Sequence, residues 1–573
     1  MFESITNYLL GSNESTKQTT EPIKHITFSG GGAKGAVYGG VYKILKKFGV
    51  IDEVEDIAGT SAGAITAAFV ATGISAEKFE DLSNKTNFKD LLGKGLVGLP
   101  IVNDAIPLYE LLRTTIATNI QDFLTEFLQN DFVIDDIKGQ LLPDLIKAKA
   151  SLEEVLRKKI DDREKYTAAI EEDEFLVIDA SELYNIDTEI TALLQQRVKF
   201  INQQSNIELL EENLQALLQK CTTEGDITFG DLALLRTIAP EKFKNLMVTA
   251  TNYQNGDLTI FSGENTPNVE IALACKASAA IPGVFQGVQI NGVWYYDGGC
   301  RDNVPIKYFA GSNNETQAQC QTLAFVFGGD DLNSSANKAI YSATPNISKT
   351  GMAKNIIDNA LYYGLGIGKG KDQMLYTAEQ NKHWEELREI ALNVVPLGTG
   401  NIGTLSFDEA AAQAKYLTLK GETQTMRYLL NHNMIDQSMN DSLALREFFL
   451  TVYEKVTTKE NPQNYLLNFV EEEKWLNQDP QIVIKEFIEL TADSNVRDEF
   501  MATLNCKQAS NVIKNVCYDY TLDNIDLNSS MVFADTDNIV DYEFYLNNHF
   551  NAFGSTHYED FGLLGNSYVM CVS

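Results

Sequence analysis

The N-terminal part of the chain repeats one pattern twice: a short hydrophobic strand, a turn of glycine and other small residues, and a helix. The first copy runs through KHITFS (24–29), GGGAKG (30–35) and an amphipathic stretch. The second runs through VEDIAG (54–59), GTSAG (59–63) and the small-residue helix AITAAFVATG (64–73). Strands that alternate with helices in this way pair in parallel, with the helices covering the sheet. The sequence therefore predicts an α/β fold with a central, mostly parallel sheet flanked by helices.

The rest of the chain separates into regions by composition. Residues 1–22 are polar and predict a flexible N-terminal segment, and residues 23–432 are expected to form the α/β domain. Charged sequence with helical periodicity interrupts this domain at about 75–240 and predicts a long helical insertion. Residues 433–573 are expected to form a mainly helical C-terminal module for partner binding or localisation.

Hydrophobic runs after the insertion predict further strands. NLMVTATN and DLTIFSG are joined through Asn255-Gly256, and GVQI and VWYYD are joined around Asn291-Gly292. Asn-Gly is a typical turn of a two-residue β-hairpin. Two more strands are expected at TLAFVFGG and EIALNVVPL, and the helical stretch that follows closes the core near residue 430.

Charge and cysteine content narrow the function classes. The chain has 46 Lys and Arg against 79 Asp and Glu, a net charge of −33 with neutral histidines. Such an acidic surface repels nucleic-acid phosphates and anionic lipid headgroups, which argues against nucleic-acid binding. The 7 cysteines form no C-x-x-C pair, which argues against a zinc site and suits a reducing compartment. The N-terminus lacks a secretory signal pattern, and no apolar run reaches the length of a membrane span.

The first glycine turn has two interpretations. Read as G-x-G-x-x-G after a strand, it fits a dinucleotide-binding fingerprint, which is a weak signal by itself. Its glycines also suit an anion cradle, in which backbone N–H groups and a helix N-terminus point at one oxygen. It is not a P-loop, because Lys34 is followed by Gly35 instead of Ser or Thr.

The second turn, GTSAG, favours the anion cradle. G-x-S-x-G between a strand and a helix is the pattern of a nucleophile elbow, in which flanking glycines let the serine occupy a tight bend. Ser61 is then the candidate nucleophile. The N–H of Ala62 and N–H groups of Gly30, Gly31 and Gly32 are candidates for an oxyanion hole. Because the pattern also arises by chance, it needs a base to support it.

Asp297 is the candidate base. None of the five histidines has an obvious position beside Ser61, although chain order alone does not exclude a late histidine in a Ser-His-Asp triad. Asp297 ends the strand VWYYD and is followed by Gly298 and Gly299. An aspartate of ordinary pKa, about 4, is a weak base and must be held within hydrogen-bond distance of the serine. The commoner role of Asp-Gly is a plain turn.

Four ordered motifs resemble the patatin-like phospholipases. These are GGGAKG, GTSAG, ASAAIPGVF (277–285) and DGG (297–299), the last followed by Asn303 and Pro305. The resemblance covers roughly residues 23–100 and 240–430, and implies a patatin-like core with a long helical insertion. It implies a catalytic Ser-Asp dyad of Ser61 and Asp297. It gives the oxyanion hole to Gly30, Gly31, Gly32 and Ala62, and supporting roles to Lys34, Gly35, Gly59, Gly63, Gly298 and Gly299. The activity it implies is phospholipase A or lysophospholipase cleavage of phospholipid acyl esters, with no metal and no cofactor.

The layout with its insertion is also similar to the VipD-type effectors that Legionella delivers into host cells. This resemblance implies a virulence effector that reaches the host cytosol without a classical signal peptide and acts at host membranes. It further implies activation by a host protein, either a small GTPase or ubiquitin. Two other hypotheses stay open: a host-protein-binding effector with residual hydrolase activity, and a dinucleotide-dependent oxidoreductase.

Three further segments bear on partners. The apolar stretch 91–112 is a candidate lid or interfacial segment, with ordinary core packing as the alternative. No Lys or Arg follows Lys514, so the acidic, aromatic tail is a candidate docking surface for a basic or mixed protein face; a solvated helical domain is the alternative. Asp535-x-Asp537 lacks the central glycine and the later ligand of a calcium loop.

Overall fold

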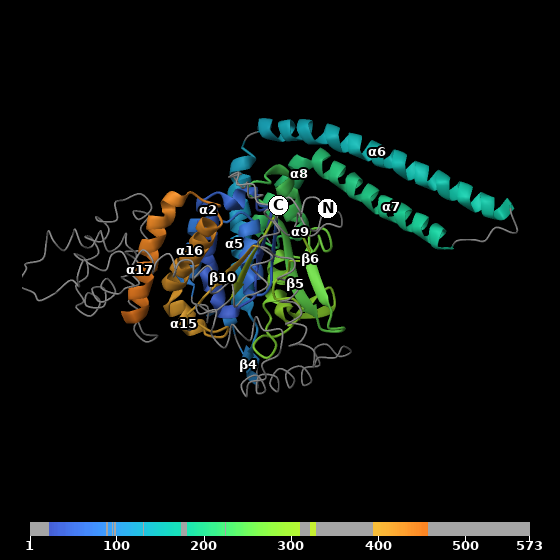
Figure 1. Ribbon diagram of the computed structural model, residues 1–573. Helices are drawn as coiled ribbons and strands as arrows, with labels where there is room; N and C mark the ends of the chain where they lie inside the picture. Colours follow the sequence, from blue (N-terminus) through green and yellow to red (C-terminus); the bar gives the residue numbers. More distant parts are fainter. Residues whose placement is uncertain are drawn as a thin grey trace, which may run out of the picture. The chain divides into compact units, whose positions relative to one another are not determined.

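The computed structural model describes most of the chain up to residue 456. The described residues are 22–86, 90–93, 95–96, 99–129, 131–172, 180–223, 225–306, 308–309, 321–327, 393–400 and 402–456. Their contacts group them into two compact units, of which one is Thr114–Ile227 and the other holds the residues on either side (Figure 1). The predicted flexible segment, apart from Pro22, and the predicted acidic docking tail lie outside the described residues.

A mixed sheet forms the centre of the first unit. Its strand order is β10-β9-β1-β2-β5-β8-β7, with β6 paired to β5. The pairs from β10 to β5 are parallel, and β6, β8 and β7 join as antiparallel neighbours. The strands are β1 (His25–Phe28), β2 (Asp56–Gly59), β5 (Asn245–Asn252), β6 (Leu258–Ser262), β7 (Val288–Ile290), β8 (Val293–Asp297), β9 (Thr322–Phe327) and β10 (Asn393–Leu397). The predicted mostly parallel sheet is confirmed.

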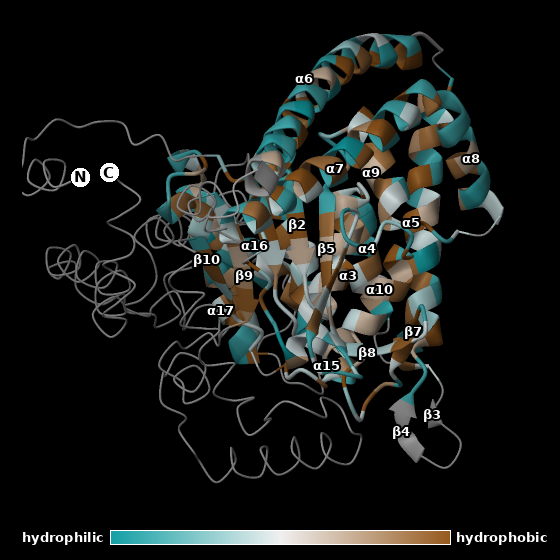
Figure 2. Ribbon diagram, turned by 90° about the vertical axis from the view of Figure 1, so that its right-hand side faces the viewer, coloured by the Kyte–Doolittle hydropathy of each residue, from teal (hydrophilic) through white to brown (hydrophobic). Residues whose placement is uncertain are grey.

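Helices flank this sheet (Figure 2). α3 packs on β2 and β5 and also touches α10, whereas α2 packs on α16. The helices are α2 (Tyr38–Lys47), α3 (Ala62–Ala71), α4 (Ala76–Lys85), α9 (Phe229–Ile238), α10 (Ile271–Ser278), α15 (Phe407–Ala412), α16 (Ala414–Asn431) and α17 (Asn440–Val456), and α5 (Ile106–Phe127) begins here.

Both predicted Asn-Gly hairpins are present. β5 and β6 pair antiparallel across Asn255-Gly256, and β7 and β8 pair across Asn291-Gly292. Asn291 and Gly292 have φ values of 50° and 82°, the left-handed conformation that this tight turn requires. One strand pair was not expected from the sequence: β3 (Gly95–Leu96) and β4 (Leu99–Asn103) form a separate two-stranded sheet inside the apolar stretch 91–112.

Two helices far apart in sequence cross at their backbones. A Cβ at position 40 on α2 would lie 1.8 Å from the carbonyl oxygen of Thr418 on α16. A Cβ at position 421 on α16 would lie 2.2 Å from the carbonyl oxygen of Val37. Only glycine permits this approach, so α16 is seated directly against the helix that follows the first glycine turn.

A buried ion-pair network joins α16 to α17. Arg446 on α17 contacts Glu422 on α16 at 2.6 Å, and their side chains are 3% and 1% exposed. Lys43 on α2 pairs with the same carboxylate at 3.0 Å. A second pair between α16 and α17, Arg427 with Glu447, has the same 2.6 Å separation but is 50% and 32% exposed.

These two pairs give a matched test of packing in this region. Arg446→Met is expected to lower the free energy of unfolding by about 3–5 kcal/mol, because it leaves a buried carboxylate with one cation fewer. Arg427→Met is expected to cost less than about 1 kcal/mol, because water solvates the exposed pair. Urea unfolding at pH 7 measures both. Equal effects of the two substitutions would contradict the burial argument.

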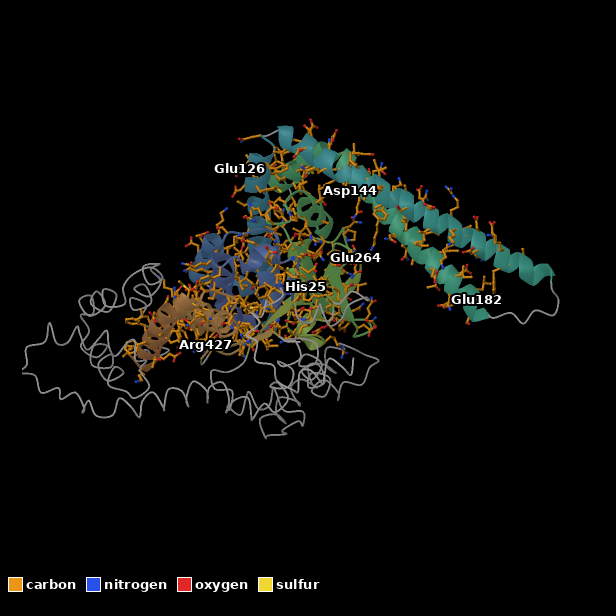
Figure 3. All side chains as sticks on the ribbon, turned by 45° about the horizontal axis from the view of Figure 1, so that its top comes forward. His25, Glu126, Asp144, Glu182, Glu264 and Arg427 are labelled. Carbon is orange, nitrogen blue, oxygen red and sulfur yellow. The ribbon has the colours of Figure 1, made fainter. Side chains whose placement is uncertain are left out.

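The second unit is helical. It contains the rest of α5, the long helices α6 (Asp131–Glu172) and α7 (Ala180–Glu208), and α8 (Leu210–Thr223). α6 and α7 lie side by side, and their side chains stand out along both, with Asp144 and Glu182 labelled in Figure 3. Ion pairs such as Arg197 with Glu153, 3.4 Å apart, link the two. Among the described helices of both units, none combines the length and apolarity that crossing a bilayer demands.

Candidate active site

Ser61 occupies the bend between β2 and α3. Its φ is 54° and its ψ is −122°, a strained backbone conformation for a residue with a side chain. The two flanking glycines allow the bend: a Cβ at position 59 would lie 2.2 Å from the carbonyl oxygen of Gly63, and a Cβ at 63 would lie 2.1 Å from that of Phe28. The residue is only 4% exposed. This is the geometry of a nucleophile elbow.

The sheet register brings Asp297 to the level of Ser61. Gly59 at the end of β2 pairs with Val248 on β5, and Asp297 at the end of β8 pairs with Ala250, two residues further along β5. Ser61, two residues beyond Gly59, therefore stands level with Asp297. The Ser61 side chain interacts with the Asp297 carboxylate and thereby lowers the pKa of that carboxyl group.

The electrostatic state of Asp297 suits a base near neutral pH. Its carboxylate is buried, and burial raises its pKa from the ordinary value of 3.8 to about 6. Hydrogen bonds from the Ser61 hydroxyl and from the Gly299 N–H, the latter 2.7 Å from Oδ1, oppose that rise. A carboxylate with a pKa near 6 accepts a proton more readily than one near 4 and is still ionised at pH 7.

The first glycine turn supplies backbone donors beside Ser61. Within the described part of the chain, no backbone carbonyl accepts from the N–H groups of Gly31, Gly32 or Ala62. The Gly30 N–H is different, because it donates to the carbonyl of Asn303 at 3.1 Å. Three of the four predicted oxyanion donors are therefore open, meaning that their N–H groups have no backbone acceptor among the described residues. The fourth, the Gly30 N–H, is already hydrogen-bonded.

Two of the three open donors are oriented by the helices that they begin. Lys34 N–H donates to the Gly31 carbonyl, and Ala64 N–H donates to the Ser61 carbonyl at 2.9 Å. The C=O and N–H of one trans peptide point in opposite directions. The Gly32 and Ala62 N–H groups therefore point out of their helix N-termini, where the helix dipole favours negative charge.

The other predicted motif residues have structural contacts. Gly32 has φ +57°, and a Cβ there would lie 2.2 Å from the Thr404 carbonyl oxygen. A Cβ at 35 would lie 2.7 Å from the Cβ of Ala62, and one at 298 would lie 2.3 Å from Thr249 Oγ1. The Lys34 ammonium lies over the Phe327 ring, 5.9 Å from its centroid.

The described histidines have contacts outside this centre. His25 pairs with Asp56 at 2.9 Å and stacks on Phe309. Both His25 and Asp56 begin parallel strands, so they lie at the opposite end of β1 and β2 from Ser61 (His25 is labelled in Figure 3). His432 stacks on Tyr428 and contacts its carbonyl oxygen.

Ser278 is a site residue that the sequence argument missed. Its Oγ accepts the Ser61 N–H at 2.8 Å, and its side chain is fully buried. The residue stands in the ASAAIPGVF motif, but only the fold shows what it contacts. A second missed contact joins the elbow to β5: the hydroxyls of Thr60 and Thr249 are 2.6 Å apart.

Ser278→Ala is expected to lower the free energy of unfolding by about 1–3 kcal/mol, because it leaves a buried N–H without its acceptor. A matched control is Ser442→Ala. Ser442 is also buried, but its hydroxyl has no hydrogen-bond partner within the described residues, so its removal is expected to be nearly neutral. Thermal unfolding of both variants measures the difference. A neutral Ser278→Ala would show that water or another group replaces the hydroxyl.

Among the described residues, no three His, Cys, Asp or Glu side chains gather so as to hold a metal ion. The prediction that catalysis needs neither a metal nor a cofactor stays a prediction.

The fold and the bend define an α/β protein that presents one serine at a strand-to-helix turn, next to a buried aspartate. The sequence model of the family described as patatin-like phospholipase matches residues 26–310, about half of the chain. The chain belongs to the patatin-like phospholipase family. The match ends before β9 and β10, which extend the same sheet beyond β1.

Curated relatives match over short segments. The chain is 39% identical over 74 residues to the uncharacterized protein YqhO of Bacillus subtilis, which is 13% of this chain and 25% of that protein. It is 41% identical over 63 residues to the probable lipid hydrolase 463L of invertebrate iridescent virus 6, which is 11% of this chain and 22% of that protein. The chain therefore spans about a quarter of the length of the curated relatives it matches.

Two solved structures align with a larger share of the chain. VipD from Legionella pneumophila aligns over 90% of this chain and 92% of its own at 19% identity, with a TM-score of 0.40. ExoU, in the ExoU-SpcU complex from the type III secretion system of Pseudomonas aeruginosa, aligns over 87% and 72% at 20% identity, with a TM-score of 0.28. Both scores are below 0.5, so the family assignment rests on the sequence match.

Proposed function

We propose that the protein is a serine acyl hydrolase that cleaves phospholipid or lysophospholipid acyl esters through a Ser61-Asp297 dyad. The observation that carries the proposal is the placement of Ser61, at its strained bend, level with the buried carboxylate of Asp297, whose pKa is about 6. Membership of the patatin-like phospholipase family supports a lipid ester as the substrate. The strained bend at Ser61 and the open N–H groups beside it support covalent acyl transfer.

In the first half-reaction, Ser61 Oγ attacks the ester carbonyl carbon while its proton passes to Asp297. The carbonyl oxygen becomes an oxyanion, which the N–H groups of Gly31, Gly32 and Ala62 stabilise. The bond from carbon to the leaving alcohol then breaks, and Asp297 returns the proton to that alcohol. The products of this half are an acyl-serine and a lysolipid or glycerol phosphodiester.

In the second half-reaction, water attacks the acyl carbon and gives its proton to Asp297. A second oxyanion forms at the same N–H groups and collapses, and Ser61 leaves carrying the proton from Asp297. The fatty acid is released and the dyad is restored. One ester and one water molecule are consumed in each cycle, and no other reactant is needed.

The test is direct: purified protein is mixed with vesicles of zwitterionic phospholipid labelled in one acyl chain, and free fatty acid and lysolipid are measured. Zwitterionic vesicles suit the first assay, because the net charge of −33 disfavours anionic surfaces. Labels at the sn-1 and the sn-2 position identify which ester is cleaved. Absence of products at every lipid composition, with and without host cytosol, would overturn the proposal.

We also propose, from the sequence resemblance alone, that the protein is a secreted effector that a host small GTPase or ubiquitin activates at host membranes. Adding host cytosol, then purified ubiquitin or a small GTPase, to the vesicle assay tests the activator. The alternative is an effector that acts chiefly by binding a host protein. If the Ser61→Ala protein reproduced the cellular effect of the wild type, the alternative would stand.

A further inference from the structure

Asn303 holds both polar groups of one glycine in the first turn. Its backbone carbonyl accepts the Gly30 N–H at 3.1 Å, and its side-chain Nδ2 donates to the Gly30 carbonyl at 3.2 Å. Asn303 itself follows the Asp297 turn by a few residues. One residue therefore ties the glycine turn to the segment that carries the base.

The side-chain bond fixes a peptide plane. The Gly30 carbonyl and the Gly31 N–H belong to the same peptide unit, and in a trans peptide they point in opposite directions. Glycine imposes little restraint of its own on the rotation of such a plane. Holding the Gly30 oxygen therefore sets the direction of the Gly31 N–H.

The Gly31 N–H is oriented by a different kind of hydrogen bond from the other two open donors. The Gly32 and Ala62 N–H groups are oriented by main-chain bonds of the helices that they begin. The carbonyl of the Gly30-Gly31 peptide instead accepts from a side chain, that of Asn303. The orientation of this one donor can therefore be removed by a single substitution.

The asparagine side chain also fills the space between the two turns. A Cβ at position 30 would lie 2.4 Å from Asn303 Oδ1, and a Cβ at 299 would lie 2.8 Å from the same atom. The Gly299 N–H in turn donates to Asp297. Asn303 could thus act on the donor or on the base, and the two routes have different signatures.

We propose that Asn303 is a positioning residue that aims the Gly31 N–H at the oxyanion, through its hydrogen bond to the Gly30 carbonyl. The inference rests on the proposed function, because it concerns the oxyanion of that reaction. Loss of one oxyanion donor costs about 10²- to 10³-fold in kcat. Loss of its orientation alone is expected to cost about 10- to 100-fold.

The kinetic test compares Asn303→Ala with the wild type on a soluble short-chain ester and on phospholipid. The expected result is the 10- to 100-fold fall in kcat, with KM within about twofold and the midpoint of the pH profile unchanged. Asn440→Ala is the matched control, since the Asn440 side chain also donates to a main-chain carbonyl, at 2.9 Å, but on the exposed end of α17. It is expected to behave as the wild type.

Two results would overturn the proposal. A shifted pH midpoint with kcat restored at high pH would mean that Asn303 acts through Asp297. An unchanged kcat would mean that the peptide plane holds without the side chain. Asn303→Leu, which has the same branching and number of side-chain heavy atoms as asparagine but no donor, repeats the test if the alanine variant does not fold.

A crystal structure of Asn303→Ala tests the same point without any activity. The expected result is a rotated or multiply oriented Gly30-Gly31 peptide, with the Asp297 turn unmoved. An unchanged peptide would refute the positioning role even in an active enzyme. A rotated peptide in a protein whose wild type cleaves no ester would instead refute the proposed function, and only the structural part would remain, that Asn303 orients the Gly30-Gly31 peptide.

Discussion

Ser61→Ala is expected to lower kcat on phospholipid by about 10⁴-fold or more, because it removes the atom that forms the acyl intermediate. The fold is expected to persist, since the Ser61 backbone N–H keeps its hydrogen bond to Ser278 when the hydroxyl is removed. The measurement is fatty-acid release, with circular dichroism as the folding control. Ser438→Ala is the matched control and should retain full activity, because Ser438 is an exposed serine in the short 3₁₀ helix Gln437–Met439 before α17.

The strained backbone at Ser61 also predicts a difference in thermal stability between two substitutions at this position. Ser61→Gly also removes the nucleophile, but glycine adopts φ near 54° without steric cost. Ser61→Gly is therefore expected to unfold at a higher temperature than Ser61→Ala, despite the greater freedom of glycine in the unfolded chain. If the alanine variant were the more stable of the two, the bend would not be strained.

Asp297→Asn is expected to lower kcat by about 10²- to 10⁴-fold, because the amide cannot take the serine proton. In the wild type, kcat is expected to rise about tenfold per pH unit below pH 6 and to level off above it, since only the ionised carboxylate is a base and its pKa is about 6. A pH profile from 4.5 to 8.5 measures this. A midpoint near 4 would contradict the role of burial.

The raised pKa of Asp297 also makes the stability of the folded protein depend on pH. The carboxyl has a folded pKa of about 6 against an ordinary value of 3.8, so the folded state binds the proton more tightly. Its contribution to stability is complete below about pH 4 and is lost as the pH rises through about 6. The stability of Asp297→Asn relative to wild type is therefore expected to increase by about 3 kcal/mol between pH 4 and pH 8. A flat difference in urea unfolding would contradict it.

The sequence sufficed for the centre of the sheet because β1, β2, β5 and β9 are almost entirely buried, and buried parallel strands read as hydrophobic runs between turns. β5 and its Asn-Gly hairpin follow directly from that pattern. The candidate nucleophile and base were also readable, because their positions need glycines for tight bends and glycine is visible in a sequence.

The contacts that hold the site together were not readable. Ser278 and Asn303 form ordinary hydrogen bonds to backbone groups more than 200 residues away in the chain. Nothing in the sequence distinguishes these contacts from those of the other serines and asparagines. The occupied N–H of Gly30 shows the same limit, because a run of three glycines does not reveal which of them is already bonded.

Two close backbone contacts matter for the synthesis of the protein. They are the crossing of α2 with α16 and the packing of Gly32 against Thr404. Ser61 leaves the ribosome early, but the main-chain groups that support the turn beside it belong to residues translated much later. A growing chain therefore holds Ser61 beside an incomplete set of supporting contacts until Thr418 has emerged.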